Sequence, residues 1–226
     1  MKKICLLSSF ILLSYVVVAQ DQFFLTDKVS GHVYRQSEEN VNINGTPFFI
    51  EEWLPGVIYM KDGAKATKFK LRFDAFSNEL LFLNGNDPLV VMNSLAGFEI
   101  TNNAGNTFQF KCGFPAIDKN TERTLYQILQ EGEQATLIKL VKKTILTIEE
   151  YNKANGSKEF SLSETYYIVK PTGTIQKIKR DRSSLLEALN GGDQKLRAWV
   201  EKNRFRCKDE EEMKQVVQAY NEKSYQ

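Results

Sequence analysis

Between about residues 56 and 179, apolar and polar side chains alternate along the chain with a period of two. The clearest run covers residues 68–74, where Phe69, Leu71 and Phe73 stand between charged neighbours. These charged neighbours are Lys68, Lys70, Arg72 and Asp74. Such a run is typical of a β-strand with one face in a core, so we expect the charged side chains to lie in water. Shorter patterns predict further strands at residues 57–60, 80–83, 89–92, 108–112, 135–141 and 166–170.

Turn-forming residues separate these predicted strands. Asp62-Gly63 and Asn84-Gly85 each lie between two strands, and Pro171-Thr172-Gly173 follows the strand at residues 166–170. Such residues supply the positive φ angles that tight hairpins need, and short connections join antiparallel neighbours. We therefore expect an antiparallel meander sheet that curls into a barrel or a sandwich. Residues 144–160 begin β-prone and become polar, which predicts a long hairpin loop.

Beyond Asp181 the apolar spacing changes to that of amphipathic helices. A capping-box pattern at residues 184–187 starts the first helix, Asp193 starts the second, and the acids of residues 209–212 match the positive end of a third helix. Short amphipathic helices need a packing partner, and the sheet is the only large one. The expected fold is mainly β (α+β), with about three short C-terminal helices packed on the sheet.

Residues 1–19 have the pattern of a secretory signal peptide. Lys2 and Lys3 precede an apolar run from Ile4 to Val18, and Ala19 provides the small residue before cleavage. The run is short for a bilayer span, which needs ~20 apolar residues, so no transmembrane span is expected after cleavage. We expect a protein of the periplasm or the outer-membrane surface, with an extracellular location as the alternative.

The spacing of apolar residues divides the remaining chain into a strand-like part and a helix-like part. Residues 20–180 are expected to form the antiparallel β domain, which begins with an irregular N-terminal arm containing one edge strand. Residues 181–226 are expected to form the helical segment that packs on the sheet.

Charge and cysteine content narrow the choice of partners. Of the 30 basic residues two lie within residues 1–19, so the processed chain has 28 against 28 acids. A balanced chain has no long-range attraction for nucleic acid, and no nucleic-acid partner is expected. Cys112 and Cys207 can pair in an oxidising compartment, and the alternative is two unpaired buried thiols.

Motifs for catalysis or metal binding are scarce. His32 is the only histidine, so any histidine-based catalytic pair depends on it, and a surface or capping role is commoner. One histidine and two distant cysteines do not supply the three or four ligands of a zinc site. Phosphate-binding glycine loops and hydrolase motifs are absent from the sequence. We predict no catalytic residue, no cofactor and no metal, while enzymatic activity through acids that converge in the fold stays open.

Two segments are candidate binding surfaces. Phe49 and Trp53 lie in an aromatic stretch with nearby Pro and Gly, as binding loops often do, and the alternative is that this stretch plugs the core. The second surface is a basic cluster that can meet an anionic lipid or glycan, or can simply be a solvated strand face. It comprises Lys177, Lys179 and Arg180.

Several strand-and-turn segments carry a resemblance to a known family. They are Gly45-Thr46-Pro47, residues 53–57, residues 70–74 with 79–82, and residues 177–180 leading into residues 185–189. Through them the chain resembles an uncharacterised family of exported, β-rich Bacteroidetes proteins with a short helical C-terminus. The resemblance implies a Gram-negative periplasmic or outer-membrane-facing location, and it brings no catalytic residue.

Three functions follow as expectations. The first is an exported envelope protein without enzymatic activity that binds an envelope protein, glycan or lipid, or has a structural role. The second is a periplasmic carrier of a hydrophobic or lipid ligand in a barrel-like cavity, and the third is a hydrolase with converging carboxylates. The carrier's cavity would be lined by Phe69, Leu71, Phe73, Phe82, Phe108 and Phe110.

Overall fold

A computed structural model describes residues 24–26, 29–35, 43–92, 94–149 and 156–225. The predicted signal peptide at residues 1–19 lies outside the described residues. The strands are β1 (Phe24–Thr26), β2 (Val29–Val33), β3 (Leu54–Met60), β4 (Lys65–Asp74), β5 (Glu79–Asn84), β6 (Asp87–Val91), β7 (Leu95–Thr101), β8 (Thr107–Lys111), β9 (Tyr126–Gln130), β10 (Thr136–Ile148), β11 (Ser157–Val169) and β12 (Ile175–Ile178). The helices are α1 (Arg182–Asn190), α2 (Gln194–Lys202) and α3 (Glu210–Glu222).

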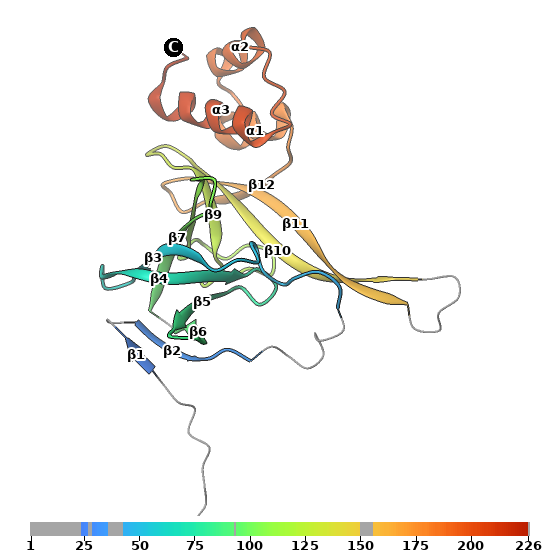
Figure 1. Cartoon of the computed structure of the whole chain (residues 1–226). Coiled ribbons are helices and arrows are strands. Elements are labelled where there is room, and N and C mark those ends of the chain that lie inside the picture. The colour runs from blue at the N-terminus through green and yellow to red at the C-terminus, as the bar shows by residue number, and fades with distance from the viewer. Residues whose placement is uncertain (1–23, 27–28, 36–42, 93, 150–155, 226) are drawn as a thin grey trace, which may run out of the picture.

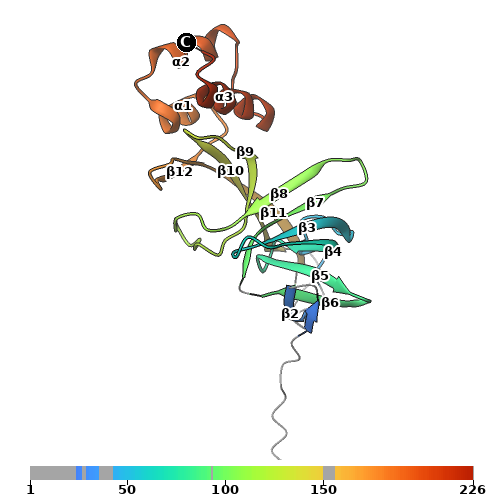
Figure 2. The same ribbon diagram turned by 90° about the vertical axis from the view of Figure 1, so that its left-hand side faces the viewer.

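The described strands form one antiparallel sheet in the order β1-β2-β6-β5-β4-β3-β7-β8-β9-β10-β11-β12. It consists of two meanders, β3 to β6 and β7 to β12, that join where β3 pairs with β7. Residues 92–94 alone connect β6 to β7 although three strands lie between them, so the sheet must curl (Figure 2). The predicted mainly β, antiparallel fold is confirmed. The sheet is open, because its edge strands β1 and β12 do not pair with each other.

Hairpin turns lie where the sequence predicts them. Gly63 and Gly85 have φ angles of +85° and +63°, in the turns after β3 and β5. Gly173, with φ of +82°, lies between β11 and β12. These left-handed conformations cost glycine little, because it has no Cβ. The turn chemistry therefore makes antiparallel neighbours of the strands on either side.

The main core lies between facing parts of the curled sheet. Phe69, Leu71 and Phe73 all point into it, as the alternation predicts. At its centre the ring of Phe110 stacks on Phe98 with centroids 4.7 Å apart, and it lies 4.9 Å from Phe73. Side chains from β4, β7 and β8 thus fill the interior.

On the opposite face of β4, Lys68 and Lys70 are exposed as expected, but the expectation that Arg72 and Asp74 lie in water is wrong. The Arg72 guanidinium lies between the rings of Phe48 and Trp53, at 3.8 and 4.2 Å from their centroids. Asp74 is only 3% exposed and accepts a 3.0 Å hydrogen bond from the Tyr34 hydroxyl. Aromatic rings and hydrogen bonds offset the desolvation of both charges, which allows these segments to cover the outer face.

The three helices cover one face of the sheet around β9 to β12 (Figure 1). α1 contacts β11 and β12, α3 contacts β9 and β10, and α2 lies outermost. Each helix buries its apolar stripe in a second hydrophobic cluster, which includes Leu186, Val200 and Val216. The predicted packing of three C-terminal helices on the sheet is confirmed.

Each helix begins at an aspartate that caps its first turn. The side chains of Asp181, Asp193 and Asp209 accept backbone N–H bonds of 2.8, 3.0 and 2.9 Å from residues three positions on. The second and third helix starts are therefore confirmed. The first was predicted three residues too late, because the Ser184 hydroxyl accepts a bond from the N–H of Lys179 instead of capping α1.

Two parts of the sheet extend further than the sequence indicates. β10 and β11 are 13 residues each and pair in register from Thr136–Val169 to Ile148–Ser157. Most of the loop expected at residues 144–160 is therefore strand, while residues 150–155 lie outside the described residues. The N-terminal arm contributes both β1 and β2, not one edge strand, because β2 pairs with β6 and β1 pairs with β2.

Candidate functional site

A pocket of about 470 Å³ opens beside the connection between β6 and β7. Its floor is apolar and is formed by side chains of the main core and its border: Leu80, Val91, Leu95 and Leu125. Its polar lining includes His32, Lys61, Glu79 and Arg123. The volume is within the ~300–1,000 Å³ range of small-molecule sites.

Arg123 is placed at the pocket by a tight turn tied to the β4–β5 hairpin. The Asn78 side chain donates to the carbonyl of Arg123 at 3.3 Å and accepts from the N–H of Leu125 at 3.0 Å. Asn78 has a φ of +63°, a conformation that asparagine tolerates better than most residues. One amide thus fixes the segment that carries Arg123.

Lys61 is a second basic residue in the lining of the pocket. It follows β3, and its N–H bonds to the carbonyl of Ser94 at 2.7 Å. Among the described residues, neither Lys61 nor Arg123 forms an ion pair. Since Glu79 is the only acid in the lining, the pocket favours an anion.

Cys112 also lines the pocket, but it is not an activated nucleophile. Its thiol lies 3.2 and 3.4 Å from the carbonyl oxygens of Leu95 and Ala96. Burial raises the pKa of the Cys112 thiol, although the charge of Lys61 opposes this shift. The thiol therefore stays protonated at neutral pH and donates to the carbonyls.

Cys207 lies in the helical cluster, away from Cys112, and both thiols are free. Burial, with a further contribution from Glu212, raises the pKa of Cys207 to about 12. Of the two alternatives from the sequence, the structure has the unpaired cysteines, of which Cys207 is buried and Cys112 half-buried.

The two thiols are expected to differ in reactivity. In the native protein, iodoacetamide should label Cys112 slowly, at a rate that rises with pH as the thiolate forms, and should leave Cys207 unmodified. Peptide mass spectrometry of native and urea-unfolded samples measures both sites. Equal native labelling, or a Cys112–Cys207 disulfide-linked peptide, would contradict this.

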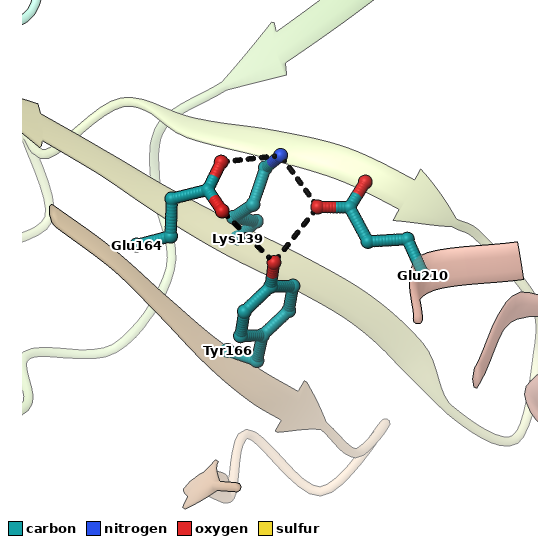
Figure 3. A network of polar contacts seen from close by, with 4 residues as sticks. All are labelled: Lys139, Glu164, Tyr166 and Glu210. Carbon is teal, nitrogen blue, oxygen red and sulfur yellow. Dashed lines mark hydrogen bonds and ion pairs between the residues drawn. The ribbon is translucent and has the colours of Figure 1, made fainter. Parts of the chain in front are cut away.

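A pair of carboxylates converges elsewhere, where α3 meets the sheet (Figure 3). The Lys139 ammonium lies 3.0 Å from Glu164 and 2.7 Å from Glu210. The Tyr166 hydroxyl lies 3.2 Å from Glu164 and 2.8 Å from Glu210, and it shares its one proton between these two acids. Burial, followed by the hydrogen bond to Glu210, raises the pKa of Tyr166. With both acids held by the same two donors, the network joins the N-terminus of α3 to β10 and β11.

The two aromatic residues of the predicted binding surface, Phe49 and Trp53, lie on opposite faces of the sheet. Phe49 turns inward, with its ring centroid 5.2 Å from Phe108 and 5.4 Å from Phe110. Trp53 lies on the other face of the sheet, against Arg72. The two side chains therefore do not form one exposed binding surface.

The predicted basic cluster follows the chain from β12 into α1. Lys177 and Lys179 are exposed on either side of buried Ile178. Arg180 lies over the ring of Tyr166, with its guanidinium carbon 5.8 Å from the centroid. The structure thus brings Arg180, alone of the three, to the Lys139 network. Sequence reasoning missed Lys61 and Arg123, because each lies in an ordinary polar turn with no motif around it.

Comparison of the chain with models of protein families, with curated proteins and with solved structures finds no match. Within the described ranges, no helix has the length and apolar character needed to cross a bilayer. The same residues contain no cluster of three or more side chains suited to holding a metal ion.

Proposed function

We propose that the protein is an exported, non-enzymatic binding module whose pocket holds a small amphipathic anion. The observation that carries this proposal is the combination of Lys61 and Arg123 with an apolar floor in one pocket. Cations bind carboxylate or phosphate oxygens through charge-assisted hydrogen bonds, while the floor takes an apolar portion. A lipid-derived carboxylate or phosphate has both parts.

The packing of the core favours this pocket over the interior as the ligand site. The six side chains expected to line a barrel cavity pack in or against the main core. None of them lines the pocket beside the β6–β7 connection. The proposed binding role therefore uses the pocket beside the β6–β7 connection and not the interior of the sheet.

The contacts of the two converging acids, Glu164 and Glu210, favour a structural role for them over a role in hydrolysis. Glu164 accepts through both of its oxygens, and Glu210 accepts through Oε1 from both Lys139 and Tyr166, so these contacts tie α3 to the sheet. Export to the periplasm or the outer-membrane surface belongs to the same proposal. The support for it is the signal-peptide pattern of residues 1–19 and the family resemblance.

Binding of decanoate and of neutral decanol by isothermal titration calorimetry tests the proposed ligand class. We expect decanoate to bind more tightly, and Lys61→Ala and Arg123→Ala each to raise its Kd by roughly tenfold or more, because each removes a charge-assisted hydrogen bond. Lys70→Ala, an exposed lysine of β4 away from the pocket, is the matched control. Equal affinities for acid and alcohol, or unchanged affinity in both pocket variants, would refute the proposal.

A further inference from the structure

The distal half of the β10–β11 hairpin projects beyond the rest of the sheet and the helices (Figure 1). It carries three of the exposed large aliphatic side chains in the described chain: Leu146, Ile148 and Leu162 are 49%, 42% and 51% exposed. Leu146 and Ile148 lie two residues apart on one face of β10, while Leu162, which pairs with Lys143, lies on the other face. Exposed aliphatic residues side by side on a projecting strand, as Leu146 and Ile148 are, are typical of an interaction surface.

One side of this hairpin is an open strand edge. β9 pairs with β10 only at residues 137–139, and the N–H of Lys143 bonds to the carbonyl of Ala75 at 3.0 Å. The backbone groups of Lys143 therefore point away from β11, and by alternation so do those of Ile145 and Thr147. Between residues 144 and 148, no described strand pairs with this side. Such an edge offers a row of backbone donors and acceptors to another strand.

We propose that two copies of the chain associate by antiparallel pairing of this edge of β10. Only residues whose backbone groups point outward can bond across the edge, so Ile145 of one copy faces Thr147 of the other. Leu146 then lies opposite its own counterpart on the two-fold axis, in the close-spaced type of pair. The Lys143 side chain of each copy comes opposite Glu149 of the other.

Charge complementarity favours a second copy as the occupant. Lys143 and Glu149 flank the apolar segment Thr144–Ile148, so an antiparallel copy brings unlike charges together at both ends. If one β10 strand is shifted by two residues along the other in either direction, Lys143 no longer lies opposite Glu149 at either end. In the proposed register, Leu146 and Ile148 of both copies gather on one face of the joined sheets and cover each other.

This association is independent of the proposed ligand. None of the residues that line the pocket comes from β10 or β11. A failure of ligand binding therefore leaves the pairing proposal standing, and a monomeric protein leaves the ligand proposal standing.

Charge reversal tests the register directly. Sedimentation velocity of the purified protein should show a concentration-dependent dimer. Lys143→Glu and Glu149→Lys should each raise the dimer Kd by roughly tenfold or more, because each homodimer carries the like-charge contact twice. An equimolar mixture of the two variants should regain the dimer, because both ends of the heterodimer again pair unlike charges. The double variant K143E/E149K should also dimerise.

A backbone variant tests the edge independently of charge. Thr147→Pro removes an N–H that points away from β11, so the hairpin ladder is kept while the intermolecular bond is lost. Thr147→Ala keeps the N–H and is the matched control, and circular dichroism verifies the fold of both. A native protein that remains monomeric over a wide concentration range overturns the proposal. So does a mixture of charge variants that fails to regain the dimer, or a Thr147→Pro variant that dimerises like the control.

Discussion

Replacing Phe110 with alanine is expected to lower the free energy of unfolding by about 4 kcal/mol, near the upper end for a single core substitution. The side chain is fully buried. Its ring stacks on Phe98 and lies within 5.4 Å of the Phe73 and Phe49 ring centroids. Alanine leaves a cavity that these rings cannot fill without leaving their own packing. Urea unfolding measures the loss as a lower midpoint at unchanged slope.

Phe108 provides the matched control for this substitution. It lies two residues earlier on β8, points to the same side and is only half-buried at the border of the core. Phe108→Ala is expected to cost about half as much, because less apolar surface is lost and the space is open to water. Equal losses for both variants would contradict the central position of Phe110 in the core.

Replacing Lys139 with methionine is expected to cost about 3 kcal/mol. The lysine side chain is buried, with 8% of its surface exposed, and it is the only cation bonded to Glu164 and Glu210 among the residues that the structure describes. Its loss leaves two carboxylates beside each other at the junction of α3 and the sheet, without the cation that bonds to both. Urea unfolding measures the loss, and faster amide exchange in α3 would locate it at that junction.

Two further variants test whether the stability loss in K139M comes from the lost charge or from the substitution as such. Lys142→Met changes an exposed lysine of the same strand and is expected to stay within about 0.5 kcal/mol of the native protein. The triple variant K139M/E164Q/E210Q removes all three charges together, so it should recover most of the stability lost in K139M. A triple variant no more stable than K139M would contradict uncompensated charge as the cause of the loss.

Elements with a local physical signal could be predicted well. The alternation centred on Leu71 identifies the core face of β4 from side-chain chemistry alone. Asp193 and Asp209 mark helix starts because a carboxylate satisfies the free N–H groups of the first turn. These signals act within a few residues, and the structure preserves them.

Elements outside the core were predicted poorly. The distal strands of the β10–β11 hairpin lack the apolar alternation of a buried strand, because neither face is fully covered there. The buried Asp74 was missed for the opposite reason, since the side chain that compensates it, Tyr34, lies far away in the sequence. A charged residue in an alternating strand carries no local sign of such a distant partner.

By itself, the sequence determined several core strands such as β4, the hairpin turns and the starts of α2 and α3, because backbone conformation there responds to neighbouring residues. It did not mark β7 or β9 as strands. Only the tertiary structure decided that β3 lies beside β7, that Lys61 and Arg123 share one pocket, and that Lys139 meets two acids. Contacts between distant segments depend on how the sheet curls and on which faces it buries. No short stretch of sequence encodes that geometry.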